Sequence, residues 1–284
     1  MFKSLLLGLR RKKIKKEFHE YGSYVETFQV GQYGPVQVAQ WKHPFSHPFK
    51  LDAGLVSFFN QFIKPGDFAI DIGAHSGDTT IPMALAAGNS GTVLALEPNR
   101  YVYRILEENA SLNKDKTHIL PLCIAATADD GVFHFNYSDA SFCNGGFLSE
   151  RKVTDPYHKY TLEIQGRNLE HLLRTEYAGY LPKLAFIKVD AEGYDKEIIK
   201  NLAGIIHDFH PFLVSECNKY LVKEEREELF DVMSAGGNTL YQVGLDQKRA
   251  SSDFRSVKKQ PLKKSDMMKQ DHFDILAVPA GRAI

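Results

Sequence analysis

The sequence has little cysteine, no net charge and no long apolar run. Its three cysteines match no zinc-binding spacing, so we expect buried, reduced thiols in a cytoplasmic protein. Basic and acidic residues balance at 35 each, and the overall charge therefore gives no reason to expect a nucleic-acid partner. The apolar core near the amino terminus is too short to predict a signal peptide or a membrane span. These absences leave a globular protein, for which 43% apolar residues provide an ample core.

Residues 1–18 combine a few leucines with many basic side chains. The pattern predicts a short helix that packs by its leucines and is otherwise solvated. A weak peripheral contact with an anionic membrane surface is the alternative. The basic residues are Lys3, Arg10, Arg11, Lys12, Lys13, Lys15 and Lys16.

A β-hairpin is predicted after this helix, because apolar and polar residues alternate in 24–30 and 35–41 around a Gly–Pro turn. Two prolines then interrupt residues 41–49, which predicts a surface loop that carries His43 and His47.

The segment FAIDIGAHSGDTT, residues 68–80, predicts a strand, a tight glycine turn and the start of a helix. A dinucleotide-binding turn needs a middle glycine for the pyrophosphate, and this chain has His75 at that position. The remaining pattern, DxGxxxG with Asp71, Gly73 and Gly77, favours S-adenosylmethionine, which has no phosphate groups.

A second acid supports this cofactor, because Glu97 ends the next strand and can accept hydrogen bonds from both hydroxyls of a ribose. Residues 125–127, at the end of the third strand, are expected to border the adenine. The predicted cofactor-binding residues are Asp71, Gly73, Ala74, His75, Gly77, Glu97, Pro98, Asn99 and Ala126.

Strand and helix patterns alternate through most of the chain, which predicts a parallel sheet with helices on both faces. The polar segment 138–159 interrupts the alternation and is expected to be an insertion beside the site. Strands are predicted at 68–72, 91–97, 118–126, 184–190, 211–217, 239–245 and 273–279, and helices at 51–63, 99–113, 194–202 and 224–237.

The segments DIGAHSGDTT, LALEPN, AATADDG, FIKVDAEGYDKEIIKNL and PFLVSE together resemble the FkbM family of S-adenosylmethionine-dependent methyltransferases. The resemblance implies a class I methyltransferase fold, which is a doubly wound, mostly parallel, seven-stranded α/β sheet of Rossmann-like type. It also implies a domain at residues 49–284, with residues 1–48 as a helix and hairpin extension. Two positions depart from the family, which most often has asparagine at His75 and glutamate at Asp195.

The segment IKVDAEG places Lys188, Asp190 and Glu192 at the carboxyl end of a strand, the edge where ligands bind in such sheets. Transfer of a methyl group to a hydroxyl requires a base, and Asp190 or Glu192 is the candidate. Lys188 and Asp190 share one face of the strand, so a buried ion pair that only shapes the site is the alternative. Asp190 and Glu192 have no third visible ligand beside them, so no metal site is predicted.

The resemblance also implies O-methylation of a sugar, glycan or other small-molecule hydroxyl. A basic segment, residues 247–269, is interpreted as a solvated loop or as a lid that attracts an anionic acceptor. A nucleic-acid methyltransferase and a non-catalytic cofactor-binding protein of the same fold stay open as alternatives.

Overall fold

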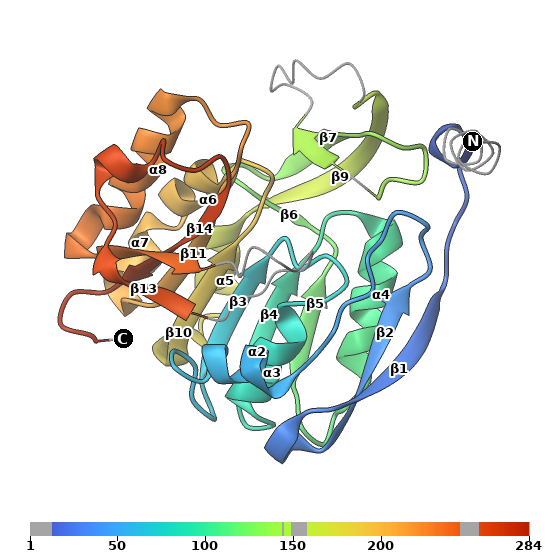
Figure 1. The fold of residues 1–284 in the computed structure, drawn as a ribbon, viewed down its shortest axis with the longest axis horizontal. Helices are drawn as coiled ribbons and strands as arrows, with labels where there is room; N and C mark the ends of the chain where they lie inside the picture. The colour runs from blue at the N-terminus through green and yellow to red at the C-terminus, as the bar shows by residue number, and fades with distance from the viewer. Residues whose placement is uncertain (1–12, 144, 149–157, 245–255, 284) are drawn as a thin grey trace.

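The computed structural model describes residues 13–143, 145–148, 158–244 and 256–283. Within these ranges a central sheet of eight strands has the order β13-β12-β14-β11-β10-β3-β4-β5 (Figure 1). Its strands are β3 (Phe68–Ile72), β4 (Thr92–Leu96), β5 (Ile119–Leu122), β10 (Leu184–Val189), β11 (Phe212–Cys217), β12 (Thr239–Gly244), β13 (Ser256–Pro261) and β14 (Phe273–Val278).

The middle of the sheet is parallel and buried on both faces. Strands β3, β4 and β10 are buried at every position, as expected from their continuous apolar runs. The antiparallel strand β14 lies between β11 and β12, so that β12 again runs in the direction of the parallel strands. The predicted mostly parallel sheet is confirmed, and β13 extends it to an eighth strand.

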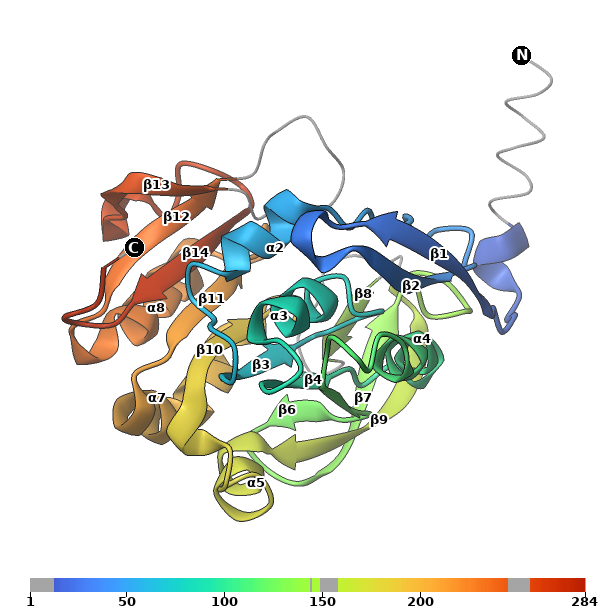
Figure 2. The same ribbon diagram turned by 90° about the horizontal axis from the view of Figure 1, so that it is seen from below.

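Helices cover both faces of this sheet, as the alternation predicts (Figure 2). One face packs against α2 (Ala53–Phe59), α3 (Thr80–Ala87) and α4 (Arg100–Ser111). The other face packs against α5 (Leu169–Thr175), α6 (Asp195–Asn201), α7 (Ala203–Phe209) and α8 (Lys223–Ser234). The fold is therefore doubly wound, with an apolar core on each side of the sheet.

The predicted strand 118–126 is wrong in one respect, because the chain divides it between two sheets. After β5 the chain leaves the central sheet, and β6 (Ala125–Thr127) pairs in parallel with β9 (Tyr160–Asn168). A second sheet of four strands in the described residues has the order β6-β9-β7-β8, with β7 (Gly131–Tyr137) and β8 (Gly145–Leu148). The segment expected as an irregular insertion thus contributes to a sheet, although residues 149–157 lie outside the described ranges.

The predicted hairpin is present as β1 (Ser23–Gln29) and β2 (Pro35–Trp41). Asn109 of α4 fastens it to the central fold: its Oδ1 accepts the Ala39 N–H at 2.7 Å, and its Nδ2 donates to the Ala39 carbonyl at 3.0 Å and to the Ser76 carbonyl at 2.7 Å. Of the predicted amino-terminal helix, residues 13–16 are helical and residues 1–12 lie outside the described part. The division of the chain at residue 48 stays a prediction.

The expected surface position of His43 is wrong, whereas His47 is exposed. His43 is 2% exposed, and its Nε2 atom lies 3.4 Å from Oδ1 of the fully buried Asp139. A buried carboxylate needs a polar partner, and the proline-rich turn supplies one by directing this ring inward. Local sequence could not show this contact, because the partner lies almost a hundred residues further along the chain.

The basic segment 247–269 is described only in part. Residues 247–255 lie outside the described ranges, and residues 256–261 form the edge strand β13 instead of the expected loop. Lysine is common on edge strands because its charge opposes pairing with other chains. In the described residues, no helix combines the length and apolar character that crossing a membrane requires.

Candidate active site

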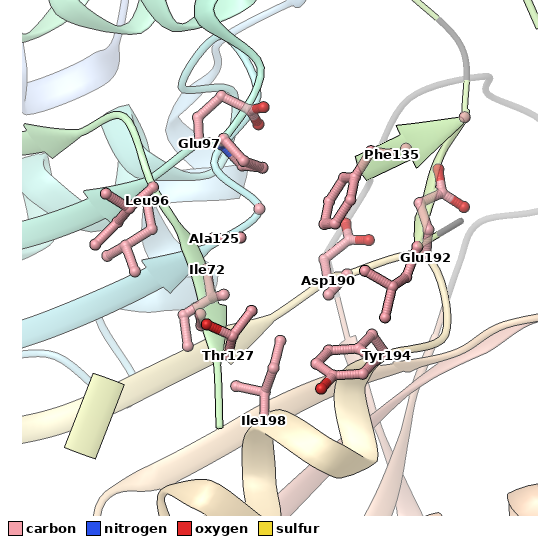
Figure 3. A pocket seen from close by; sticks show the side chains of 18 of the residues that line it. Ile72, Leu96, Glu97, Ala125, Thr127, Phe135, Asp190, Glu192, Tyr194 and Ile198 are labelled. Atoms are coloured by element: carbon pink, nitrogen blue, oxygen red, sulfur yellow. The ribbon is translucent and has the colours of Figure 1, made fainter. Parts of the chain in front are cut away.

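A pocket lies at the carboxyl ends of β3, β4 and β10, between the central sheet and the second sheet (Figure 3). It encloses about 750 Å³ of empty space, including its open mouth. Ligands of doubly wound sheets bind at this edge. The lining residues are Ile72, Gly73, Leu96, Glu97, Pro98, Ile124, Ala125, Ala126, Thr127, Phe135, Tyr137, Gly145, Gly146, Leu148, Asp190, Ala191, Glu192, Tyr194 and Ile198.

The two glycines of the first turn serve different contacts. Gly73 lines the pocket with a φ of 77°, and a Cβ atom there would lie 1.8 Å from the Asp190 carbonyl oxygen. Glycine is required at this position because the loop after β10 passes directly against it. Gly77 has a φ of 98°, and its Cβ would meet the Leu106 side chain of α4 at 3.2 Å, away from the pocket lining.

Asp71 points into the protein and does not line the pocket. One carboxylate oxygen accepts the hydroxyls of Thr79 at 2.8 Å and Thr80 at 2.6 Å, and the other lies 3.4 Å from Nζ of Lys188. The aspartate therefore joins the beginning of α3 to the ion pair on β10. Asp71 therefore supports the turn after β3.

Glu97 is buried at the end of β4, and its carboxylate lines the pocket. Each of its oxygens accepts one backbone N–H, from His75 at 2.9 Å and from Asn99 at 2.8 Å. Burial raises the pKa of Glu97 to about 7, and these two hydrogen bonds oppose the increase. Each oxygen keeps acceptor capacity, which suits the two hydroxyls of a ribose.

The other predicted cofactor residues fall into two groups. Pro98 and Ala126 line the pocket, whereas Ala74 and Asn99 are buried beside it. Asn99 is the N-cap of α4, because its Oδ1 accepts the Tyr101 N–H at 3.1 Å. Its backbone N–H also donates to the Glu97 carboxylate, which lines the pocket.

His75 has a left-handed backbone, with a φ of 48°, and does not line the pocket. Its ring stands edge-on to that of Trp41, with 5.9 Å between the ring centroids. Burial lowers the pKa of His75, while Asp78 and Asp190 act in the opposite direction. The His75 ring thus connects the first turn to the β1–β2 hairpin. The backbone N–H of His75 donates a hydrogen bond to Glu97.

Lys188 is 4% exposed and lies between two carboxylates, 3.4 Å from Asp71 and 3.3 Å from Asp190. Burial lowers the pKa of this lysine, but the carboxylates of Asp190, Asp71 and Asp78 outweigh burial and raise the pKa above its usual value. A lysine held in its charged form cannot accept a proton. Lys188 and Asp190 therefore form the ion pair that was the alternative to a catalytic role for Lys188.

Asp190 and Glu192 reach the pocket from the loop after β10, opposite Glu97 (Figure 3). The Asp190 side chain is 41% exposed. Glu192 has a left-handed backbone, with a φ of 49°, which is strained for a residue with a Cβ atom. Burial raises its pKa to about 7, with added repulsion from Asp190 and Asp195. A carboxyl group with this pKa is suited to proton transfer near neutral pH.

Three residues at the site were missed from the sequence. Asp195 is 1% exposed and accepts N–H groups of Gly193 at 3.0 Å and Ala191 at 3.4 Å, so that it holds the loop of Glu192 in shape. Glu216 and Asn218, at the end of β11, lie beside Glu192. The segment PFLVSE contained Glu216, but nothing local indicated that the two strand ends would meet.

The segment 138–159 was expected beside the site, but the sheet to which it contributes was missed. Phe135, Tyr137, Gly145, Gly146 and Leu148 of β7 and β8 form one wall of the pocket. The polar composition around these residues predicted only a loop, although Leu162 and Ile164 of β9 alternate with polar residues as a half-buried strand requires.

The pocket suits S-adenosylmethionine. Leu96, Ile124 and Phe135 supply an apolar wall for an adenine, and the Glu97 carboxylate supplies acceptors for a ribose. The exposed carboxylate of Asp190 suits the positive charge of the amino and sulfonium groups. Among the described residues, no three His, Cys, Asp or Glu side chains are arranged to hold a metal ion.

The fold and the pocket together define a Rossmann-like α/β protein that binds a nucleoside-containing cofactor. The sequence pattern of the Methyltransferase FkbM domain matches residues 71–240, which is more than half of the chain. The protein therefore belongs to the FkbM family of methyltransferases, and its cofactor is S-adenosylmethionine.

Solved structures with a similar fold include three methyltransferases. A methyltransferase FkbM from Methylobacillus flagellatus is 12% identical, with a TM-score of 0.42, and the match covers 78% of this chain and 50% of that one. An S-adenosylmethionine-dependent O-methyltransferase from Thermotoga maritima is 11% identical, with a TM-score of 0.39 and coverages of 91% and 79%. A precorrin-6y C5,15-methyltransferase from Geobacter metallireducens is 11% identical, with a TM-score of 0.39 and coverages of 80% and 88%.

This chain thus spans about half the length of the Methylobacillus protein. No curated protein matches the sequence significantly. The family assignment depends on the domain match alone.

Proposed function

We propose that the protein methylates a hydroxyl group of a sugar, a glycan or another small molecule. The observation that carries the proposal is the position of Asp190 and Glu192 on the side of the pocket opposite Glu97 (Figure 3). If Glu97 holds the ribose, the reactive end of the cofactor extends toward these two carboxyl groups. An acceptor hydroxyl placed there meets both the methyl group and a base.

Bound S-adenosylmethionine supplies an activated methyl group on a positively charged sulfur. The chain's contribution is to hold the acceptor in line with that group and to remove its proton. Glu192 is the proposed base, because its pKa of about 7 allows it to be ionised near neutral pH and to gain a proton during the reaction. Asp190 would face the positive end of the bound cofactor, and Lys188 fixes the position of Asp190 through their ion pair at 3.3 Å.

The charges in the described part of the site favour a neutral acceptor. Asp190 and Glu192 lie at this end of the pocket, and an anionic group close to them would be repelled. An anionic acceptor would depend on the basic segment 247–269, of which residues 247–255 lie outside the described ranges. Sugars and other polyols are neutral acceptors of the proposed kind.

The proposal is tested in two steps. Isothermal titration with S-adenosylmethionine and with its demethylated product measures cofactor binding, and absence of binding to both would refute the proposal. A single-turnover assay with radiolabelled cofactor then compares pools of neutral sugars, phosphorylated sugars and transfer RNA. Transfer to RNA alone would favour the nucleic-acid alternative, and tight cofactor binding without transfer to any pool would favour a non-catalytic protein.

A further inference from the structure

Asn218 lies where two carboxyl groups of the site meet. It follows β11 and is 3% exposed, and its Nδ2 atom is 3.2 Å from Oε2 of Glu192 and 2.8 Å from Oε2 of Glu216. Its Oδ1 atom accepts the N–H of Tyr220 at 3.0 Å. The reverse orientation of the amide would turn its oxygen toward both carboxyl groups and lose the bond from Tyr220. The amide therefore donates one N–H to each carboxyl group.

Arg226 of α8 fixes the backbone on both sides of this amide. It is 3% exposed, and its guanidinium donates to the carbonyl oxygens of Asn218 at 3.3 Å and Leu221 at 3.1 Å. It also donates to three carbonyl oxygens before β14, those of Met267 at 3.0 Å, Gln270 at 2.6 Å and Asp271 at 2.5 Å. Five charge-assisted hydrogen bonds thus join two segments and hold Asn218 in place.

We propose that Asn218 is the positioning residue of the general base: it directs Glu192 to the pocket and stabilises its ionised form. The inference rests on the proposed function, in which Glu192 accepts the proton of the hydroxyl. Each hydrogen bond that a carboxylate accepts from an N–H stabilises its ionised form relative to the protonated acid. Because the Asn218 amide donates to both Glu192 and Glu216, it also holds the two carboxyl groups apart.

Burial affects both carboxyl groups of the pair. It raises the pKa of Glu216 to about 10, with repulsion from Asp190 adding to it. Burial raises the pKa of Glu192 only to about 7, and the hydrogen bond from Asn218 opposes the increase. Other charged or titratable groups that face the pair are Asp195, Lys219, Tyr137 and His272, whose Nε2 is 3.4 Å from Oε1 of Glu216.

The test replaces the amide with an apolar side chain of similar size, Asn218→Leu. The pKa of Glu192 is measured by NMR with carboxyl-labelled glutamate, and the Glu192→Gln variant assigns the signal. Loss of a hydrogen bond to a charged group is expected to raise this pKa by about one unit. The single-turnover rate should fall about tenfold at pH 6 and recover at high pH, with cofactor affinity unchanged.

Asn238→Leu is the matched control, because Asn238 donates to the Met233 carbonyl at 3.0 Å and contacts neither carboxyl group of the pair. It should lower stability without moving the pKa of Glu192. If Asn218→Leu does not fold, the isosteric Asn218→Asp removes the same donors and should raise the pKa of Glu192 further.

An unchanged Glu192 pKa in a folded Asn218 variant would overturn the inference. The NMR titration does not depend on turnover, so it separates the two proposals. A raised pKa in a protein that transfers no methyl group would refute the proposed function and leave the link between Asn218 and Glu192 standing.

Discussion

The turn after β3 and the loop after β10 meet at the same edge of the sheet but are built for different purposes. In the first, the carboxylate of Asp71 binds the hydroxyls of Thr79 and Thr80, inside the protein. In the second, Asp190 and Glu192 face the pocket. The difference teaches that the turn with the glycine motif shapes the pocket, while the loop after β10 carries the carboxyl groups that we propose to be reactive.

The backbone geometry of the two loops is similar. The first turn holds His75 in a left-handed conformation at a φ of 48°, between Gly73 and Gly77. The second loop holds Glu192 in the same conformation at a φ of 49°, next to Gly193. Strain of this kind persists only where the surroundings enforce it, and it is concentrated at functional sites.

Among the substitutions in the two loops, the largest effect on methyl transfer is expected at Glu192. Glu192→Gln keeps the size of the side chain and removes the base, so we expect the single-turnover rate to fall about 10² to 10⁴-fold. Cofactor affinity should change less than about twofold, because the side chains opposite Glu97 do not hold the ribose. Glu163→Gln, at an exposed position of β9, is the control. A Glu192→Gln enzyme with normal turnover would assign the chemistry elsewhere.

Gly73→Ala tests the contact between the two loops. The new Cβ would meet the Asp190 carbonyl oxygen at 1.8 Å, and the residue has a φ of 77°. We expect the free energy of unfolding to fall by about 3 kcal/mol and cofactor binding to be lost, measured by denaturant titration and calorimetry. Gly22→Ala has no neighbouring atom within 4 Å and should be neutral. Equal stability of both variants would contradict the contact.

The pH dependence of unfolding tests the raised pKa of Asp195. Burial raises its pKa to about 7, so the folded state binds a proton more tightly than the unfolded state between about pH 4 and pH 7. The stability that this proton provides is complete below pH 4 and is lost as the pH rises to 7. Asp195→Asn should therefore flatten the pH dependence of unfolding by up to ~1.4 kcal/mol per pH unit. Parallel curves for the two proteins would show that Asp195 does not titrate in this range.

His75 is expected to give the smallest effect. His75→Asn keeps a residue that tolerates the left-handed conformation and keeps the N–H that binds Glu97, while the contact with Trp41 is lost. Cofactor affinity should change less than about threefold, and the loss of stability should be about 0.5 kcal/mol. A tenfold loss of affinity in calorimetry would give this side chain a direct part in binding.

Much of the fold could be predicted because its signals are local. The apolar runs of β3, β4 and β10 identify buried parallel strands, and Glu97 could be placed at the end of β4 from the same pattern. The positions of Gly73, Glu97, Asp190 and Glu192 at one pocket follow from the rule that the carboxyl ends of parallel strands share an edge. The second sheet was missed because its pairings, such as β6 with β9, join distant segments.

The sequence by itself determined the order of strands and helices, the glycine turn and the identity of the acids at the strand ends. Only the tertiary structure decided which way those acids point: Asp71 inward to two threonines, Glu97 to two backbone N–H groups, and Glu192 to Asn218, which is 26 residues away in the sequence. The reason is physical, because a buried carboxyl group must find its partners among whatever groups the packing brings near it. The partners that are furthest away in sequence, His75 for Glu97 and Asn218 for Glu192, are recorded by no local pattern.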